Sequence, residues 1–209
     1  MKRKQNNQQK YTMQKVIING EESDSDNEDN EDDKYIKTIN NNIYFHCDVN
    51  KKNVLELLRQ LTTLANSLKK IDTQYNTKSE INLYIHSDGG DLFAGLSAMH
   101  HIEQMDIHIN TIVDGVAMSA ATFILMGGHT RKMYPYSMVL IHQLKTGFWG
   151  THECLIDELK NSNLIMQNLK EMYLSKSKIP AKKLDEILKR ELLFSSQDCI
   201  KYKLVDEII

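Results

Sequence analysis

Hydrophobic and polar residues alternate in two patterns along the chain, and the order of these patterns predicts strands separated by helices. Apolar residues recur at helical spacing in 54–68, 92–105 and 152–175. The segments 81–85 and 107–113 are instead short apolar runs, which are typical of buried strands. Strands separated by helices indicate βαβ crossovers, so the expected fold class is α/β. We expect further strands at 43–47, 131–134, 138–141 and 205–209, and further helices at 117–126, 181–190 and 196–203.

The first 40 residues lack this patterning and are predicted to form a disordered polar and acidic tail. Asn, Gln, Lys, Asp and Glu dominate there, and they cannot bury enough apolar surface to offset the entropy of ordering. Residues 21–33 hold nine acidic and no basic residues, so the rest of the chain is net basic although the formal net charge is −2. We therefore expect a tail at 1–40 and one folded domain at 41–209.

Composition excludes several classes of protein. The basic residues are dispersed and form no stripe with aromatic residues, so nucleic-acid binding is not favoured. Cys47, Cys154 and Cys199 are far apart and form no CxxC pair, which argues against disulfides and against a thiolate metal site. No apolar run is long enough to span a membrane or to act as a secretory signal. We expect a cytoplasmic protein without a membrane anchor, a metal or a cofactor.

Ser119 is the first candidate for chemistry, because it lies among small residues between an apolar strand and a short apolar helix. Unpaired backbone N–H groups at a helix start favour the negative charge of an attacked carbonyl. Gly89 and Gly90 occupy a similar strand-to-helix turn, where glycine lets the backbone approach a ligand closely. Each feature also has a structural explanation, which is helix capping for the serine and steric relief for the glycines.

A serine nucleophile needs a base and a third group that orients the base. His142 is the preferred base among the eight histidines, because it directly follows an apolar strand. His46 and His86 lie in or just after early strands and stay open as alternatives.

Several short motifs in one collinear order resemble the proteolytic subunit of the Clp protease, within the broader Clp/crotonase fold. Residues 81–90 (INLYIHSDGG) resemble a family strand that ends in NSPGG. Residues 115–119 (GVAMS) resemble GxAAS, which ends in the nucleophile, and 138–143 (MVLIHQ) resemble VMIHQ around the catalytic histidine. Near the end, 193–195 and 202–206 resemble FLS and YGLVD. The resemblance implies repeated strand-strand-helix units with a protruding strand/helix handle.

The resemblance also implies roles for five residues. Ser119 would be the nucleophile and His142 the general base. The backbone N–H groups of Gly90 and Ala120 would form the oxyanion hole. The third member of the triad, normally aspartate, falls on Glu191, which is a departure from the family pattern.

The alternatives to Glu191 stay open. Glutamate can accept a hydrogen bond from an imidazole, but the backbone must absorb its extra methylene. Asp185 and Asp198 are alternative carboxylates, and Glu191 can also be explained as a solvated charge beside Arg190. Asp88 stands where the family has proline, and its carboxylate would oppose an oxyanion if it pointed inward.

In the family, a glycine-containing strand and a long helix form the handle by which two heptameric rings meet. Residues 145–150 and 152–175 occupy these positions, and a helix with apolar residues on more than one face needs a partner. The resemblance implies a homo-oligomeric ring, commonly two stacked heptamers, that an AAA+ unfoldase ATPase supplies with unfolded protein. The chain has no phosphate-binding loop, so the partner would use the ATP.

The sequence therefore predicts a serine endopeptidase, the proteolytic subunit of an ATP-dependent Clp-type protease. A catalytically silent ring subunit is the main alternative, favoured if Glu191 does not reach His142. A crotonase-type acyl-CoA enzyme would share the fold without needing Ser119 and His142 in these motifs. A pure binding module would explain the acidic tail alone.

Overall fold

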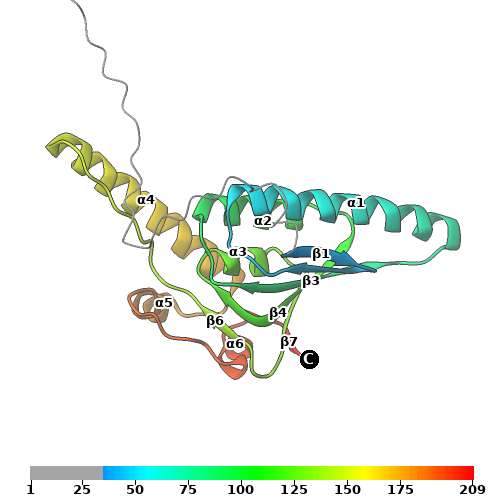
Figure 1. Cartoon of the computed structure of the whole chain (residues 1–209). Helices are drawn as coiled ribbons and strands as arrows, with labels where there is room; N and C mark the ends of the chain where they lie inside the picture. The colour runs from blue at the N-terminus through cyan, green and yellow to red at the C-terminus, as the bar shows by residue number, and fades with distance from the viewer. Residues whose placement is uncertain (1–34) are drawn as a thin grey trace, which may run out of the picture.

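The computed structural model describes residues 35–209, in which seven strands form one sheet flanked by helices (Figure 1). The mixed α/β architecture expected from the hydrophobic pattern is confirmed. The strands are β1 (Ile36–Ile39), β2 (Asn42–Phe45), β3 (Glu80–Ser87), β4 (His108–Met118), β5 (Thr130–Met133), β6 (Met138–Leu140) and β7 (Glu207–Ile208). The helices are α1 (Lys51–Tyr75), α2 (Leu92–Glu103), α3 (Ala121–Met126), α4 (His152–Lys176), α5 (Ala181–Leu188) and α6 (Ser196–Lys201).

The strand order is β1-β2-β3-β4-β5-β7, and β6 pairs with the carboxyl end of β4. β1 is antiparallel to β2, and the other described pairs are parallel. Parallel neighbours need crossover connections, and α1, α2 and α3 supply them. The carboxyl ends of β3, β4 and β6 consequently lie at one edge of the sheet.

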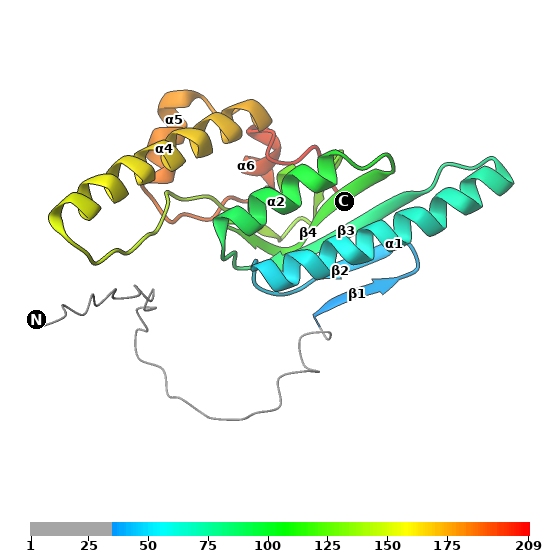
Figure 2. The ribbon, with the colours of Figure 1, turned by 90° about the horizontal axis from the view of Figure 1, so that it is seen from above.

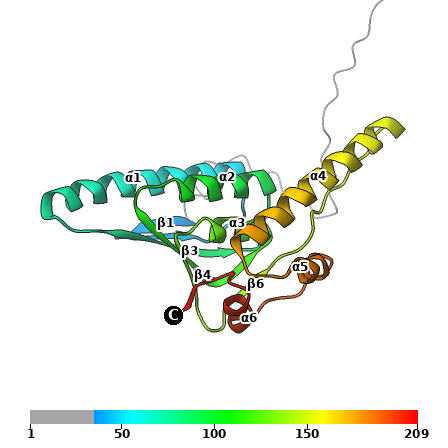
Figure 3. The ribbon, with the colours of Figure 1, turned by 180° about the vertical axis from the view of Figure 1, so that it is seen from behind.

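The helices are divided between the body and a projection. α1 and α2 lie side by side over one face of the sheet, with α3 between α2 and the strands (Figures 1 and 2). α4 extends away from the body, while α5 and α6 lie near its inner end (Figure 3). Within residues 35–209, no helix has the length and apolar character needed to cross a membrane.

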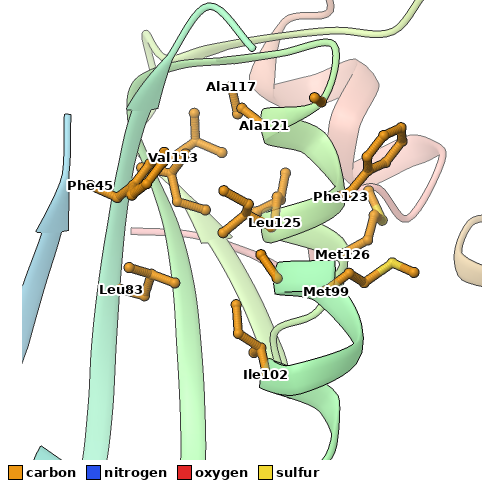
Figure 4. Packing of buried hydrophobic residues seen from close by; sticks show 14 of the residues in the cluster. Phe45, Leu83, Met99, Ile102, Val113, Ala117, Ala121, Phe123, Leu125 and Met126 are labelled. Atoms are coloured by element: carbon orange, nitrogen blue, oxygen red, sulfur yellow. The ribbon is translucent and has the colours of Figure 1, made fainter. Parts of the chain in front are cut away.

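The core lies between the sheet and these helices. Along β3 burial alternates residue by residue, so Ile81, Leu83 and Ile85 point inward. Figure 4 shows Leu83 and other strand residues facing Leu125 of α3 and Ile102 of α2. Burying an aliphatic side chain of this size stabilises the fold by about 1.5–3 kcal/mol. This packing fixes the strand ends from which the candidate site is built.

The folded domain begins earlier than residue 41. β1 lies at Ile36–Ile39, inside the segment expected to be tail, and Ile36 is buried. Its hydrogen bonds to β2 order a segment whose composition alone looks polar. The rest of the predicted tail, including the acidic block at 21–33, lies outside the described residues.

Two elements differ from the prediction by the position at which they end. α1 continues to Tyr75, beyond residue 68 where its expected helical pattern ends, and Asn76 ends it in the left-handed conformation. Residues 117–118, expected to begin a helix, instead continue β4, because β6 pairs with that end of the strand. The handle segment 145–150 forms no strand in this single chain.

Candidate active site

The register between β4 and β6 brings two strand ends together. In this parallel pair Met118 lies opposite Leu140, so Ser119 follows one strand end and His142 lies two residues beyond the other. The backbone N–H of Ser119 donates a 2.8 Å hydrogen bond to the carbonyl of Leu140. The sheet therefore places the predicted nucleophile and the predicted base at the edge where parallel strands end, and both line the same cavity.

The Ser119 turn is held in an unusual backbone conformation. Its φ is +52°, in the left-handed region that residues other than glycine rarely adopt. Such conformations cost about 1–3 kcal/mol and persist where the surroundings fix them. The backbone N–H and the hydroxyl of Thr122 both donate to the Ser119 carbonyl, at 3.0 and 2.6 Å. Ser119 is thus tied at its N–H by β6 and at its carbonyl by α3.

The glycine turn after β3 packs directly on the Ser119 turn. A Cβ atom on Gly89 would lie 2.7 Å from the Met118 carbonyl oxygen and 2.8 Å from the Ser119 Cβ. Gly89 also has a φ of +104°, which side chains rarely tolerate. Glycine is therefore required here for the two turns to touch.

Gly90 and Ala120 both lie at the cavity, one in each of the two turns. Val49 brackets the glycine turn, because its N–H donates to the Gly89 carbonyl and its carbonyl accepts from the Asp91 N–H. Neither the Gly90 nor the Ala120 N–H takes part in the hydrogen bonds that close these turns. Both residues line the cavity, of about 530 Å³, together with Ser119 and His142. The arrangement has the chemistry of an oxyanion hole.

His142 is half-buried, and the contact of its ring defines its tautomer. Its Nδ1 lies 2.5 Å from the carbonyl oxygen of Gln143. A carbonyl only accepts hydrogen bonds, so Nδ1 carries the proton in the neutral ring and Nε2 is left as the basic nitrogen. This is the tautomer that a general base facing Ser119 requires.

Glu191 contacts a lysine in this structure. Its carboxylate forms a 2.5 Å ion pair with Lys145, and its side chain is 57% exposed. The hydrogen bond and charge of Lys145, with a smaller contribution from His142, hold the pKa of Glu191 below its ordinary value. Glu191 does not line the cavity. In this structure Glu191 thus accepts its hydrogen bond from Lys145, and His142 contributes only a smaller part of the lowered pKa.

The two alternative carboxylates are engaged elsewhere. Asp185 forms a 2.6 Å ion pair with Lys170 of α4, which lowers the pKa of Asp185. Asp198 accepts the hydroxyl of Ser195 in the capping box of α6. Neither residue lines the cavity, and each is held by a partner other than His142.

The cavity has further walls that the sequence reasoning missed. Phe93 of α2 and Leu169 and Tyr173 of α4 line it, and Tyr173 is buried. The helical pattern of 152–175 shows an apolar face there but does not indicate what that face covers. Asp88 also lines the cavity and is exposed.

Across 35–209, no cluster of three or more His, Cys, Asp or Glu side chains is arranged to hold a metal ion. A larger cavity, of about 680 Å³, lies at the opposite end of the strands and is lined by residues such as Lys69, Glu80 and His108. The serine and histidine brought together by β4 and β6 are at the smaller cavity.

The chain belongs to the Clp protease family, a family of peptidases, because the family model described as Clp protease matches residues 26–209. This confirms the resemblance and the fold class expected from the motifs. Two relatives are each named ATP-dependent Clp protease proteolytic subunit. One, from Deinococcus radiodurans, is 32% identical over 141 residues, which cover 66% of this chain and 69% of the relative. The other, from Mesostigma viride, is 27% identical over 141 residues, which cover 66% of this chain and 61% of the relative.

Proposed function

We propose that this chain is a serine endopeptidase, the proteolytic subunit of an ATP-dependent Clp-type protease. One observation carries the proposal: Ser119 and His142, at the ends of paired strands, share a cavity with the N–H groups of Gly90 and Ala120. A nucleophile, a base and two backbone donors are the parts that acyl transfer needs. The Clp family membership agrees with this assignment.

The proposed reaction proceeds through an acyl-enzyme. The Ser119 hydroxyl attacks a peptide carbonyl while His142 Nε2 takes its proton, and the N–H groups of Gly90 and Ala120 hold the oxyanion. His142 then gives the proton to the leaving amine as the C–N bond breaks. Water, deprotonated by His142, attacks the ester and releases the second peptide and the free serine.

Glu191 is proposed as the group that orients His142. It is the carboxylate at the matching motif position, and the charge of His142 already contributes to its lowered pKa. Hydrogen bonding to Nδ1 would require the Glu191 side chain to leave Lys145 and the Nδ1–H to leave the Gln143 carbonyl. Both side chains of the ion pair are more than half exposed, so this exchange costs little in a high dielectric.

The direct test is labelling with a fluorophosphonate probe, which reacts with an activated serine. We expect a covalent adduct on the wild-type chain that is absent from Ser119→Ala. Ser67→Ala is the matched control, because Ser67 is exposed on α1, where its hydroxyl donates to the Thr63 carbonyl, and it does not line the cavity. A wild-type chain without a Ser119-dependent adduct would contradict the peptidase proposal.

Self-assembly into a ring is proposed from the exposed apolar residues of the handle. Leu155, Leu159 and Leu164 on α4 are 47%, 62% and 58% exposed, and Trp149 before the helix is 93% exposed. Apolar side chains on a projecting helix are stabilised when a second subunit covers them. We expect a large assembly in light scattering and a smaller one after Leu159→Glu; a wild-type monomer near 24.2 kDa would contradict the ring.

The proposed substrates are unfolded proteins, supplied by an AAA+ ATPase partner in the cytoplasm. Both relatives carry the name ATP-dependent Clp protease proteolytic subunit, and Cys47, Cys154 and Cys199 form no disulfide with one another, which suits a reducing compartment. Stimulation of casein degradation by a Clp ATPase with ATP, relative to the peptidase alone, tests the partnership.

A catalytically silent ring subunit is the second candidate. The Lys145 ion pair favours it, since Glu191 then accepts its hydrogen bond from a residue other than the base. The two candidates differ in the fluorophosphonate experiment, because a silent subunit would assemble without forming the Ser119 adduct.

A further inference from the structure

Two buried hydroxyl groups outside the proposed triad are linked by hydrogen bonds in a series that ends at the backbone carbonyl of Ser119. Thr122 is fully buried in α3, and Tyr173 of α4 is 2% exposed. The Tyr173 hydroxyl lies 2.6 Å from Thr122 Oγ1, which lies 2.6 Å from the carbonyl oxygen of Ser119. Neither hydroxyl has a role in the acyl-transfer steps described above.

The direction of this series follows from counting protons. The Ser119 carbonyl can only accept, so Thr122 uses its single hydroxyl hydrogen there. Thr122 Oγ1 must then accept the bond from Tyr173, whose hydroxyl is the donor. Burial raises the pKa of Tyr173, so this hydroxyl keeps its proton at neutral pH.

The last acceptor in this series, the Ser119 carbonyl, belongs to the same backbone peptide group as the Ala120 N–H, which is a proposed oxyanion donor. The Ser119 carbonyl and the Ala120 N–H are the two ends of one planar peptide group and point in opposite directions. Holding the carbonyl oxygen inside the protein therefore aims the Ala120 N–H the other way, toward the cavity. Hydrogen bonds in a chain also polarise one another, which strengthens the N–H as a donor.

We propose that Thr122 and Tyr173 are positioning residues that orient the Ser119–Ala120 peptide as an oxyanion donor. The inference rests on the proposed peptidase function. If so, the orientation of the Ala120 N–H depends on α4, because Tyr173 belongs to that helix. Tyr173 also packs against Phe123, with 6.0 Å between the ring centroids. A shift of the inner end of α4 would loosen the peptide without touching Ser119 or His142.

The test compares kcat and KM for a fluorogenic peptide in variants that remove one hydroxyl each. Thr122→Val keeps the shape of the side chain and should lower kcat on the order of tenfold or more, toward the effect of losing one oxyanion donor. Tyr173→Phe should lower kcat by about threefold to tenfold, because it weakens the bond indirectly. KM should stay within about twofold of the wild-type value in both variants, since the hydrogen bond from the Ala120 N–H to the oxyanion forms in the transition state.

Three controls separate positioning from a merely structural role. Thr122→Ser restores the hydroxyl and should keep wild-type kcat. In the Thr122→Val background, adding Tyr173→Phe should lower kcat no further, because Tyr173 acts through Thr122. Tyr202→Phe removes a tyrosine hydroxyl near Phe194, away from the cavity, and should leave kcat unchanged.

The outcomes are distinguishable. If wild-type protein forms the Ser119 adduct but both hydroxyl deletions keep kcat within about twofold, the positioning role is overturned and the peptidase proposal stands. Equal losses in Thr122→Ser and Thr122→Val would also overturn it. If wild-type protein forms no Ser119-dependent adduct, both proposals fail together. Thermal unfolding of each variant shows whether a lost kcat reflects lost folded protein.

Discussion

The nucleophile turn and the carboxylate proposed to orient the base differ in how the chain holds them. Ser119 is tied at its N–H and its carbonyl by hydrogen bonds and packs against Gly89. Glu191 is more than half exposed and is held by one lysine. The nucleophile turn is built by the core of a single chain. The position of Glu191 depends on exposed surface side chains, so it is the group that assembly or substrate is able to move.

Removing the base should give the largest effect. His142→Ala should lower kcat about 10⁴-fold or more, because Ser119 then has no group to take its proton. Peptide hydrolysis measures this, and His152→Ala, an exposed histidine with an 83% exposed side chain, is the control. If the His142 variant keeps more than a tenth of wild-type kcat, the assignment of the base is wrong.

Separating the Gly89 turn from the Ser119 turn should give the next largest loss of kcat. Gly89→Ala places a methyl group 2.7 Å from the Met118 carbonyl, so the Gly90 donor moves away from Ser119. Losing one oxyanion donor lowers kcat by about 10²-fold to 10³-fold. Ser67→Ala is the control, since Ser67 is exposed on α1 away from both the cavity and the handle. Wild-type kcat in folded Gly89→Ala protein would show that the contact between the turns is not needed.

A carboxylate held as firmly as the nucleophile offers a contrast to Glu191. Asp206 accepts both a side-chain and a backbone hydrogen bond from Arg131, whose side chain is only 13% exposed. We expect Asp206→Asn to lower the free energy of unfolding by about 2 kcal/mol, in the range for hydrogen bonds to charged groups. Lys145→Met should change it by less than about 0.5 kcal/mol, because its ion pair is exposed. Urea denaturation measures both, and equal losses would remove the contrast.

The same contrast predicts a pH dependence of stability. Burial acts to raise the pKa of Asp206, but the hydrogen bonds and charge of Arg131 outweigh it and lower the pKa below 3.8. A carboxyl group with a lowered folded-state pKa contributes stability above its unfolded pKa, and this contribution is lost as pH falls through the folded value. The difference in stability between wild type and Asp206→Asn should therefore be full near pH 6 and shrink below about pH 4. A difference that is constant to pH 2 would contradict this assignment.

The smallest effect is expected at Glu191. Glu191→Gln should lower kcat by about tenfold, far less than loss of the base, because solvent screens its charge and the Gln143 carbonyl already sets the tautomer of His142. Lys145→Met frees the Glu191 carboxylate and should not lower kcat. Full activity in Glu191→Gln would reject it as the orienting group, and an equal loss in Lys145→Met would show that the ion pair itself is required.

Much of the fold, and the neighbouring positions of four residues proposed for the site, could be predicted because the signals are local. A strand end, a glycine turn and a serine at a helix start are each encoded within a few residues, so Gly90, Ser119, Ala120 and His142 could be placed from motif and periodicity. The boundaries that the prediction missed depend on partners distant in sequence. β1 forms because β2 accepts it, and the end of β4 stays extended because β6 pairs with it.

By itself, the sequence determined the α/β class, the order of the elements and the residues that would meet at one edge of a parallel sheet. Only the tertiary structure decided that Glu191 bonds to Lys145 and that Tyr173 reaches Thr122 from a helix 51 residues away. The physical reason is the range of the forces involved. Backbone conformation follows from neighbouring residues, whereas an ion pair or a buried hydroxyl chain depends on where distant side chains meet after folding.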